Sequence, residues 1–382
     1  MSAWARFIGG PVMMSCLWGG VALDAAAQEL RSTCAENLRN SVRAAAQFRE
    51  LPGLQFALLH QSGEFVELAV GEASPGKPLT VKQPLRIASL SKVLTGLAAL
   101  EADRSGLLPL DSYLIDALDL SRKSVGEGAG SIRIRDLLAH RSGLARNDGL
   151  DETLRPRPRC PGRSAEVLAE PLARRPGERF EYSNMGYCLV GEALSKAHHA
   201  PLSEIIGSMV ERHIGASSLR VHDGRSTAVL YHPSPDDRAD DPARYRFNYS
   251  AMLASGGFES TATDLARLMH AAFDRTSLDL LDIAPDACRR LAGRRNCHGL
   301  IFHVERRFGD PAVFWRDGSL PGTTALAAIT ADGAWIWVAL SNQRRTNWQG
   351  WNESLLQAID EGARAFNQCT STRAQTMPGI KR

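Results

Sequence analysis

Apolar and polar positions along this chain follow two periods, one typical of strands and one typical of helices. Runs with strand-like composition lie near both ends, at residues 54–59, 65–70, 298–304, 312–315, 323–329 and 334–340. Gln61–Glu64 and Asp332-Gly333 separate neighbouring runs, as the turns of β-hairpins do. Helical spacing is found at 30–49, 90–100, 132–139, 165–172, 184–196, 202–214, 262–273 and 352–366.

The order of these elements predicts the fold class. Strands at both ends with helices between them indicate an antiparallel sheet built from both chain ends, with flanking helices. A mostly helical region at about 89–295 is inserted into that sheet. We therefore expect an α/β chain of the α+β type, with a cleft where the sheet meets the helical region.

The first 27 residues have the pattern of an export signal. A basic residue precedes an apolar run at 7–23, and the small residues Asp24-Ala25-Ala26-Ala27 follow it. Gly and Pro interrupt the run, which is also short for a membrane span. We expect cleavage near Ala27-Gln28, which leaves residues 28–382 as one periplasmic or secreted domain without a stable membrane span.

Two further features of the sequence bear on where the protein is located and on what it binds. Met13-Met14-Ser15 before Cys16 leaves a lipoprotein anchored at Cys16 as the alternative to a cleaved signal peptide. The chain has 45 basic and 42 acidic residues, and its net charge of +3 is too small to indicate nucleic-acid binding.

Six cysteines remain after Cys16, and an even number in an oxidising compartment predicts disulfides. Fifteen pairings of six cysteines are possible. We expect Cys288–Cys297 to close a short loop, Cys34–Cys369 to join the two terminal helices, and Cys160–Cys188 to form the third bridge. Free buried thiols are the alternative. The chain contains no Cys-x-x-Cys pair, so no zinc site is predicted.

The apolar helical run at 89–100 begins with Ser89-x-x-Lys92. Residues three apart share one face of a helix, so Ser89 would lie beside Lys92. Burial lowers the pKa of a lysine readily, and a hydroxyl beside a lysine that can lose its proton is an activated nucleophile. This pattern predicts acyl transfer. The same spacing recurs at Ser74–Lys77, where the intervening Pro-Gly predicts a turn instead.

Two later segments supply further candidate groups. Tyr182-Ser183-Asn184 stands where a helix is predicted to begin, so Tyr182 would move protons and Asn184 would bind a substrate amide or ester. Alternatively, Asn184 caps the helix and Tyr182 packs at the surface. Near the end of a predicted strand, Gly318 permits close approach of a ligand. The backbone N–H groups of Ser319 and Ser89 would form an oxyanion hole.

Ser-x-x-Lys, Tyr-x-Asn and a later x-x-Gly follow one another as in penicillin-recognising serine enzymes. Leu137–Leu144 is similar to the segment "LLTHTSGL" of that group, and Ala254–Leu265 is similar to "AAGGLVSTARDLARF". The chain thus resembles the class C β-lactamase-type serine hydrolases over about residues 55–345. That family also contains D-alanyl-D-alanine carboxypeptidases, D-aminopeptidases and esterases.

The resemblance implies a serine hydrolase without a metal or an organic cofactor. Ser89 would attack an ester or amide carbonyl, while Lys92 and Tyr182 share the proton transfers and Asn184 orients the substrate. Which of Lys92 and Tyr182 is the general base stays open. The implied partner is a small-molecule, peptide or ester substrate, and the oligomeric state is not predicted.

The third motif departs from the family pattern, which is usually Lys-Thr-Gly or His-x-Gly. Here it is Arg316-Asp317-Gly318, and we expect all three residues to contact the substrate. Asp317 replaces a hydroxyl that helps to bind a substrate carboxylate in β-lactam-directed members. Two anions about 4 Å apart repel by about 1 kcal/mol in water and more strongly in a cleft. This argues against penicillins as good substrates.

We therefore favour an esterase or an amidase, acting on substrates whose amine would pair with Asp317. Alternatively, Asp317 forms an ion pair with Arg316 or another arginine. A second reading of the whole chain is a catalytically inactive relative that binds cell-wall fragments or a protein partner.

Overall fold

A computed structural model describes residues 16–144, 152–225, 228–231, 247–281, 297–306 and 310–376. Its main sheet is antiparallel and is built from both ends of the chain, as the sequence predicts. Within the described residues the sheet has seven strands in the order β3-β2-β1-β10-β9-β8-β7. Their bounds are β1 (Gly53–His60), β2 (Phe65–Ser74), β3 (Lys77–Pro78), β7 (His303–Glu305), β8 (Val313–Leu320), β9 (Thr323–Thr330) and β10 (Trp335–Ser341).

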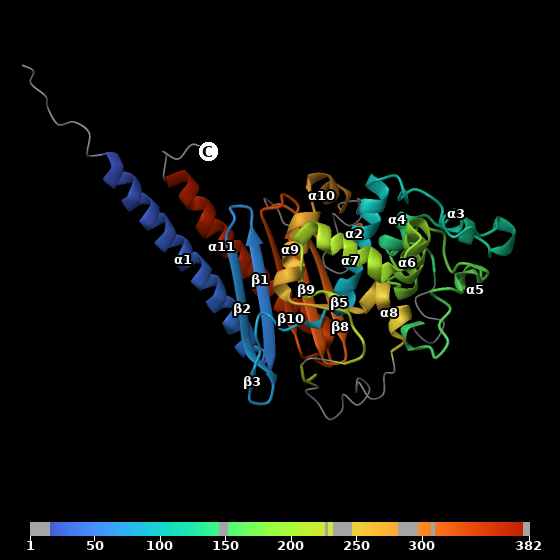
Figure 1. Ribbon diagram of the computed structural model, residues 1–382, viewed down its shortest axis with the longest axis horizontal. Coiled ribbons are helices and arrows are strands. Elements are labelled where there is room, and N and C mark those ends of the chain that lie inside the picture. Colours follow the sequence, from blue (N-terminus) through green and yellow to red (C-terminus); the bar gives the residue numbers. More distant parts are fainter. Residues whose placement is uncertain are drawn as a thin grey trace, which may run out of the picture.

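The N-terminal and C-terminal parts of the sheet meet where β1 pairs with β10, with Leu54 opposite Ser341. Helices cover both faces of this sheet (Figure 1). Because neighbouring side chains of a strand point to opposite faces, Trp315 and Trp337 pack against the terminal helices, whereas Phe314 and Val338 pack against the helical region. Burial on both faces explains why the sequence shows continuous apolar runs there.

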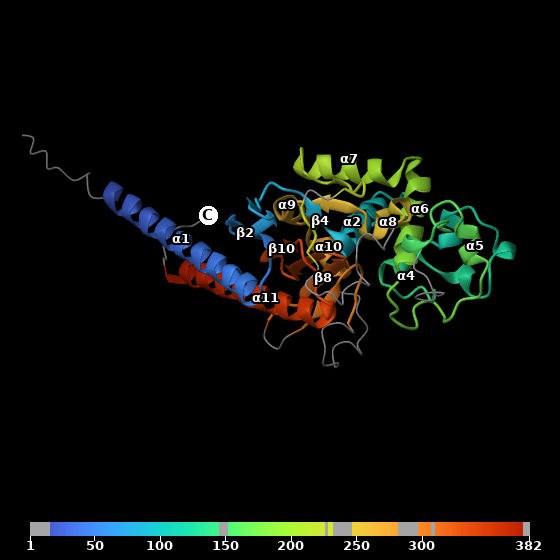
Figure 2. The same cartoon turned by 90° about the horizontal axis from the view of Figure 1, so that it is seen from below.

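The terminal helices α1 (Cys16–Phe48) and α11 (Trp348–Thr376) lie side by side on one face of the sheet (Figure 2). The predicted disulfide between Cys34 and Cys369 joins them. Helix α1 runs through the predicted cleavage site at Ala27-Gln28, and residues 1–15 of the predicted signal lie outside the described residues. Among the described helices, none is long and apolar enough to cross a membrane.

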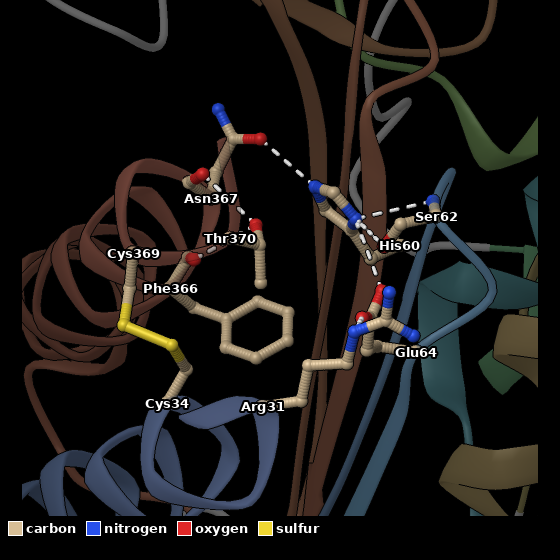
Figure 3. A network of polar contacts seen from close by, with 9 residues as sticks. All are labelled: Arg31, Cys34, His60, Ser62, Glu64, Phe366, Asn367, Cys369 and Thr370. Carbon is tan, nitrogen blue, oxygen red and sulfur yellow. Dashed lines mark hydrogen bonds and ion pairs between the residues drawn. A yellow bond between two sulfur atoms is a disulfide. The ribbon is translucent and has the colours of Figure 1, made fainter. Parts of the chain in front are cut away.

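A buried histidine lies beside this disulfide (Figure 3). His60, at the end of β1, points its Nε2 at Asn367 Oδ1 of α11 over 2.9 Å, and its Nδ1 at Ser62 Oγ. Arg31 of α1 forms an ion pair with Glu64 of the β1–β2 hairpin, at 3.2 Å between nitrogen and oxygen. We call this group the terminal clamp; it comprises Arg31, Cys34, His60, Ser62, Glu64, Asn367 and Cys369. It connects α1, α11 and the hairpin.

The inserted region covers the other face of the sheet. Its helices are α2 (Ser91–Arg104), α3 (Leu114–Ala117), α4 (Ile134–Leu138), α5 (Ser164–Leu168), α6 (Asn184–His198), α7 (Leu202–Ile214), α8 (Tyr249–Gly256), α9 (Ala262–Ala272) and α10 (Arg275–Leu281). Short 3₁₀ turns are η1 (Ala88–Leu90), η2 (Arg122–Ser124), η3 (Ala129–Ser131) and η4 (Glu152–Leu154). Cys160 and Cys188 form the second predicted disulfide. Cys297 is buried, and its predicted partner Cys288 lies outside the described residues.

The structure departs from the sequence prediction in several places, among them a small sheet and the strand predicted before residue 304. A small second sheet, β4 (Leu85–Arg86), β6 (Phe258–Ser260) and β5 (Arg220–Val221), was not predicted, because strands of two or three residues show no periodicity. The strand predicted at 298–304 is too long, since β7 begins only at His303. Ile301, two residues before β7, has φ of +71°, which no regular strand accommodates.

Candidate active site

Ser89 lies in the 3₁₀ turn η1, directly before helix α2. Ala88, which precedes it, has φ of +45°, a conformation that is uncommon for residues other than glycine. Ser89 is partly exposed, whereas Ala88 and Leu90 on either side of it are buried. The turn therefore presents the Ser89 hydroxyl while its neighbours anchor the backbone.

The three candidate catalytic side chains come together although Ser89 and Tyr182 are 93 residues apart in sequence. Ser89 Oγ lies 2.7 Å from Tyr182 Oη, and either hydroxyl can donate. Lys92 Nζ donates to Ser89 Oγ over 3.3 Å. The helical i, i+3 relation between Ser89 and Lys92 is thus present, and Ser89 Oγ touches two groups that can exchange protons with it.

Lys92 is fully buried, and further acceptors hold its Nζ in place. Lys92 Nζ donates to Asn184 Oδ1 and to the backbone oxygen of Ser255, each over 2.7 Å. Asn184 is the first residue of α6, and the Ser183 hydroxyl caps that helix by accepting from Gly186 N–H. Asn184 is therefore not the cap that the alternative prediction assumed. Ser255 lies in α8 and was not singled out from the sequence.

Two cations flank the rings of Tyr182 and Tyr187. Lys92 Nζ lies 4.9 Å and 5.5 Å from the two ring centroids, and Arg316 Cζ lies 5.9 Å and 5.4 Å from them. Burial raises the pKa of the Tyr182 phenol, while the Arg316 charge and the hydrogen bond with Ser89 act in the opposite direction. Tyr182 is therefore a neutral phenol near neutral pH.

Strand β8 passes directly beside the nucleophile turn. A Cβ built on Gly318 would lie 2.8 Å from the Ser89 backbone nitrogen and 2.9 Å from the backbone oxygen of Ile87. Real Cβ atoms do not approach backbone atoms this closely, so only glycine allows the strand to reach the turn. Ser319 follows Gly318 at the partly exposed end of the strand.

Arg316 and Asp317 have separate surroundings, because successive residues of a strand point to opposite faces. Asp317 is partly exposed and accepts a hydrogen bond from Asn352 Nδ2 of α11 over 3.1 Å. Its negative charge contributes to the raised pKa of Tyr182. The alternative pair between Asp317 and Arg316 is not formed, since the Arg316 guanidinium extends toward Ser89 and Ile301.

The surroundings of Arg316 differ from those expected for a substrate-binding side chain. Arg316 is 1% exposed, and its Nε donates to the backbone oxygen of Ser89 over 3.1 Å. Its other nitrogens point at the backbone oxygen of Ile301, at His298 and at His140. The side chain is thus enclosed by protein, and contact between Arg316 and a substrate stays a prediction.

The structure also brings in two histidines that the sequence analysis did not place in the site. The His140 ring lies 4.5 Å from the Tyr182 ring between centroids, and the His298 ring lies 5.0 Å from that of His140. Burial holds the pKa of both imidazoles well below the usual value, and nearby positive charges act in the same direction. The similarity of 137–144 to a family segment was the one available signal for His140. Within the described part of the chain, no group of three or more His, Cys, Asp or Glu side chains is arranged to hold a metal ion.

Comparison with known proteins adds family information to this geometry. The beta-lactamase family model matches residues 38–358, which is most of the chain. The D-amino acid amidase from Ochrobactrum anthropi SV3, solved with L-phenylalanine, superposes with a TM-score of 0.69 at 17% identity, covering 90% of this chain and 99% of that one. At that identity the likeness concerns the fold alone, and it agrees with the predicted α/β class.

Two curated relatives have different printed roles. A putative fimbrial assembly protein, FimD of serogroup D from Dichelobacter nodosus, is 37% identical over 273 residues, which are 67% of this chain and 66% of that protein. The chain thus spans just under two thirds of that relative's length. The D-alanyl-D-alanine-carboxypeptidase/endopeptidase AmpH from Escherichia coli K12 is 26% identical over 212 residues, or 52% of each chain.

Proposed function

Because the chain belongs to the beta-lactamase family, which has hydrolase members, we propose that it is an exported serine hydrolase acting through an acyl-enzyme on Ser89. The observation that carries this proposal is the position of Ser89 Oγ, 2.7 Å from Tyr182 Oη and 3.3 Å from Lys92 Nζ. A hydroxyl held between two proton-transferring groups has the arrangement of an activated nucleophile.

In the proposed reaction Ser89 Oγ attacks the carbonyl carbon of an ester or amide and gives up its proton to the Lys92–Tyr182 pair. Because Tyr182 is a neutral phenol, the step requires Lys92 as the neutral amine, and the proton passes to Nζ directly or through the Tyr182 hydroxyl. The same pair returns a proton to the departing alcohol or amine. Water then attacks the acyl-enzyme, loses a proton to the pair, and releases the acid while Ser89 regains its hydroxyl. Asn184, which accepts from Lys92 Nζ, is assigned to orient the substrate.

We assign the oxyanion to the backbone N–H groups of Ser89 and Ser319. The close approach of Gly318 to the Ser89 nitrogen supports this assignment, because Ser319 is the next residue of the strand. Two preorganised N–H donors in such a site commonly contribute about 10²–10³-fold each to the rate.

Asp317 determines the proposed substrate class. Its carboxylate is held by Asn352 at the partly exposed end of β8. A fixed negative charge there disfavours substrates that carry a carboxylate next to the scissile bond, and it favours neutral or amine-bearing esters and amides. Export is supported by the two disulfides, which are typical of oxidising compartments.

The experiment that tests the proposal is covalent labelling followed by intact-mass spectrometry. Wild-type protein, Ser89→Ala and Ser74→Ala would each be incubated with a fluorophosphonate and, separately, with a fluorescent penicillin. We expect the fluorophosphonate to add once to wild type and to Ser74→Ala, and not to Ser89→Ala. Ser74 is the matched control, since it belongs to the second Ser-x-x-Lys sequence, which lies in the β2–β3 turn.

The penicillin arm separates two kinds of site. Little or no penicillin adduct is expected, because Asp317 would repel the penicillin carboxylate. No adduct from either reagent would contradict the hydrolase and favour a non-catalytic binding protein.

A further inference from the structure

Arg316 is enclosed beside the nucleophile, and each part of its guanidinium has a defined neighbour. Nε donates to the backbone oxygen of Ser89, and Nη1 donates to the backbone oxygen of Ile301. Nη1 also lies 3.4 Å from His298 Nε2, and Nη2 lies 3.2 Å from His140 Nε2. His298 Nδ1 donates to the backbone oxygen of Gly299, so its Nε2 is free to accept from Arg316. The contact with His140 Nε2 is a close approach, because His140 Nδ1 accepts from Ser183 N–H and Nε2 then carries the ring proton.

The three segments that Arg316 contacts all contain unfavourable backbone conformations. Ala88, directly before Ser89, has φ of +45°, His140 has +55° and Ile301 has +71°. Positive φ is a marked outlier for a β-branched residue such as Ile301. A conformation of this kind is unfavourable and persists only where the surroundings hold it.

Each of these segments carries or supports a candidate catalytic group. Ser89 itself follows Ala88, and the Ile301 side chain packs closely on Gly96 of helix α2, the helix that presents Lys92. His140 Nδ1 accepts from the backbone N–H of Ser183, which lies between Tyr182 and Asn184. The Arg316 guanidinium therefore contacts Ser89 directly, and it is connected to the other candidate groups through His140 and Ile301 and the segments that these two residues contact.

The chemistry of the fork explains why an arginine suits this position. A guanidinium presents five N–H donors in one plane, so it can hold several acceptors in fixed relative positions. A lysine presents three donors from a single atom and cannot reach the Ser89 oxygen and the His140 ring in the same way. The positive charge also stays permanently beside Tyr182, since arginine does not lose its proton in proteins.

We propose that Arg316 is a positioning residue, whose guanidinium holds the strained Ser89, His140 and Ile301 segments in the geometry that activates Ser89, and that it does not bind the substrate. This inference rests on the proposed hydrolase function. It predicts that changes at Arg316 reduce the rate of the chemical step and leave substrate affinity almost unchanged.

The test compares Arg316→Lys with wild type in two assays. One is the concentration dependence of fluorophosphonate labelling, which separates the maximal labelling rate from the inhibitor affinity. The other is hydrolysis of a neutral nitrophenyl ester, which separates kcat from KM. We expect the maximal labelling rate and kcat to fall about 100-fold, with affinity and KM within about threefold of wild type, because small displacements of reacting groups have effects of this size.

Two further variants make the test specific for position. Arg364→Lys is the matched control, because Arg364 is a partly buried arginine of α11 that pairs with Asp310 and Asp360. It should keep wild-type kinetics. Ala88→Gly combined with Arg316→Lys should recover about tenfold of the lost rate, because glycine adopts positive φ without strain and needs less support.

His140→Asn serves as the test if Arg316→Lys does not fold. It removes the contact between His140 and Arg316 and keeps the Arg316 charge. His140→Asn can still accept from the Ser183 N–H but is too short to reach Arg316 as well, so we expect about a tenfold loss in maximal rate with unchanged affinity.

The possible outcomes are distinct. A rise in KM or a loss of inhibitor affinity at unchanged maximal rate, in either single variant, would show that Arg316 serves binding and would overturn the inference. Full activity of Arg316→Lys, or no recovery with Ala88→Gly, would overturn it as well. Absence of labelling in the wild type would instead overturn the hydrolase proposal, and this inference with it.

Discussion

Two buried histidines in this molecule have opposite surroundings. In the terminal clamp, the acceptor Asn367 Oδ1 lies at His60 Nε2, while the Ser62 hydroxyl and N–H and the Glu64 carboxylate lie near Nδ1. His60 therefore has acceptors within reach on both sides of its ring. In the site, His140 meets N–H donors at both nitrogens, from Ser183 and from Arg316.

The backbone conformations of the two regions also differ. His60 ends a regular strand, and the clamp is closed by a disulfide whose cysteines are 335 residues apart. The site contains the positive φ values of Ala88, His140 and Ile301. Of the six residues other than glycine that have positive φ in the described chain, three thus lie at the proposed catalytic centre. Such conformations persist only where the surroundings hold them, so the packing of the site must support them.

The largest expected effect comes from removing a proton-transferring group in the strained region. Tyr182→Phe deletes the hydroxyl that lies 2.7 Å from Ser89 Oγ and leaves the ring between Lys92 and Arg316. We expect kcat on a neutral ester to fall about 10²–10⁴-fold, the usual contribution of general acid–base groups. A melting temperature within a few degrees of wild type would show that the fold is retained, and activity above a tenth of wild type would contradict the role.

Removing the disulfide of the terminal clamp should have the opposite effect to Tyr182→Phe: the protein loses stability and keeps its catalytic rate. Cys34→Ser with Cys369→Ser removes the disulfide between α1 and α11. We expect the free energy of unfolding to decrease by about 2–4 kcal/mol, as for other native disulfides. Urea denaturation measures this change, and the maximal fluorophosphonate labelling rate at 25 °C should stay within twofold. A large fall in that rate would show that the two regions are coupled.

The buried histidines of the site should make stability depend on pH. Burial, together with the charges of Arg316, Lys92 and the neighbouring histidines, lowers the pKa of His140, and burial with His303 and Arg316 lowers that of His298. The unfolded chain, with histidine pKa near 6.5, then binds more protons than the native one below that pH. Stability is therefore fully present above about pH 6.5 and is lost as the pH falls.

Each of these histidines contributes a slope of up to about 1.4 kcal/mol per pH unit. Urea titrations at pH 7.5, 6.5 and 5.5 would measure the total slope. His298→Asn should flatten the curve, because asparagine does not titrate. Equal stability at all three pH values would contradict the assignment of buried neutral histidines.

The smallest predicted effect concerns Asp317, which lies on β8 and bonds to Asn352 of the terminal helix α11. Asp317→Thr removes a negative charge and keeps a small hydrogen-bonding side chain. We expect the ratio of kcat/KM for a carboxylate-bearing ester to that for its amine-bearing analogue to rise about tenfold, equivalent to about 1.4 kcal/mol of electrostatic discrimination. Asp310→Thr, which alters an exposed carboxylate away from Ser89, is the control, and an unchanged ratio at Asp317 would remove its role in substrate choice.

The sequence alone determined most of the fold, because in a long periodic segment the spacing of the apolar residues shows both the type of element and the face that is buried. The sheet strands β1, β9 and β10 and the helices α6, α7 and α9 lie where the apolar pattern predicts them, and the predicted strand at 312–315 covers the first part of β8. Two of the three predicted disulfides are present. The spacing of Ser89 and Lys92 also implied their contact, since it depends only on the helical period.

Only the tertiary structure decided where the side chains of the site point and which groups they contact. Alternation along β8 sends Arg316 inward and Asp317 to the opposite face, and a one-residue shift in register would exchange them. The shortened strand before His303 arises because Ile301 supplies a carbonyl to Arg316 in a conformation that no local propensity favours. Contacts between residues such as Arg316 and His140, 176 positions apart, depend on the packing of whole elements, and no local pattern in the sequence encodes them.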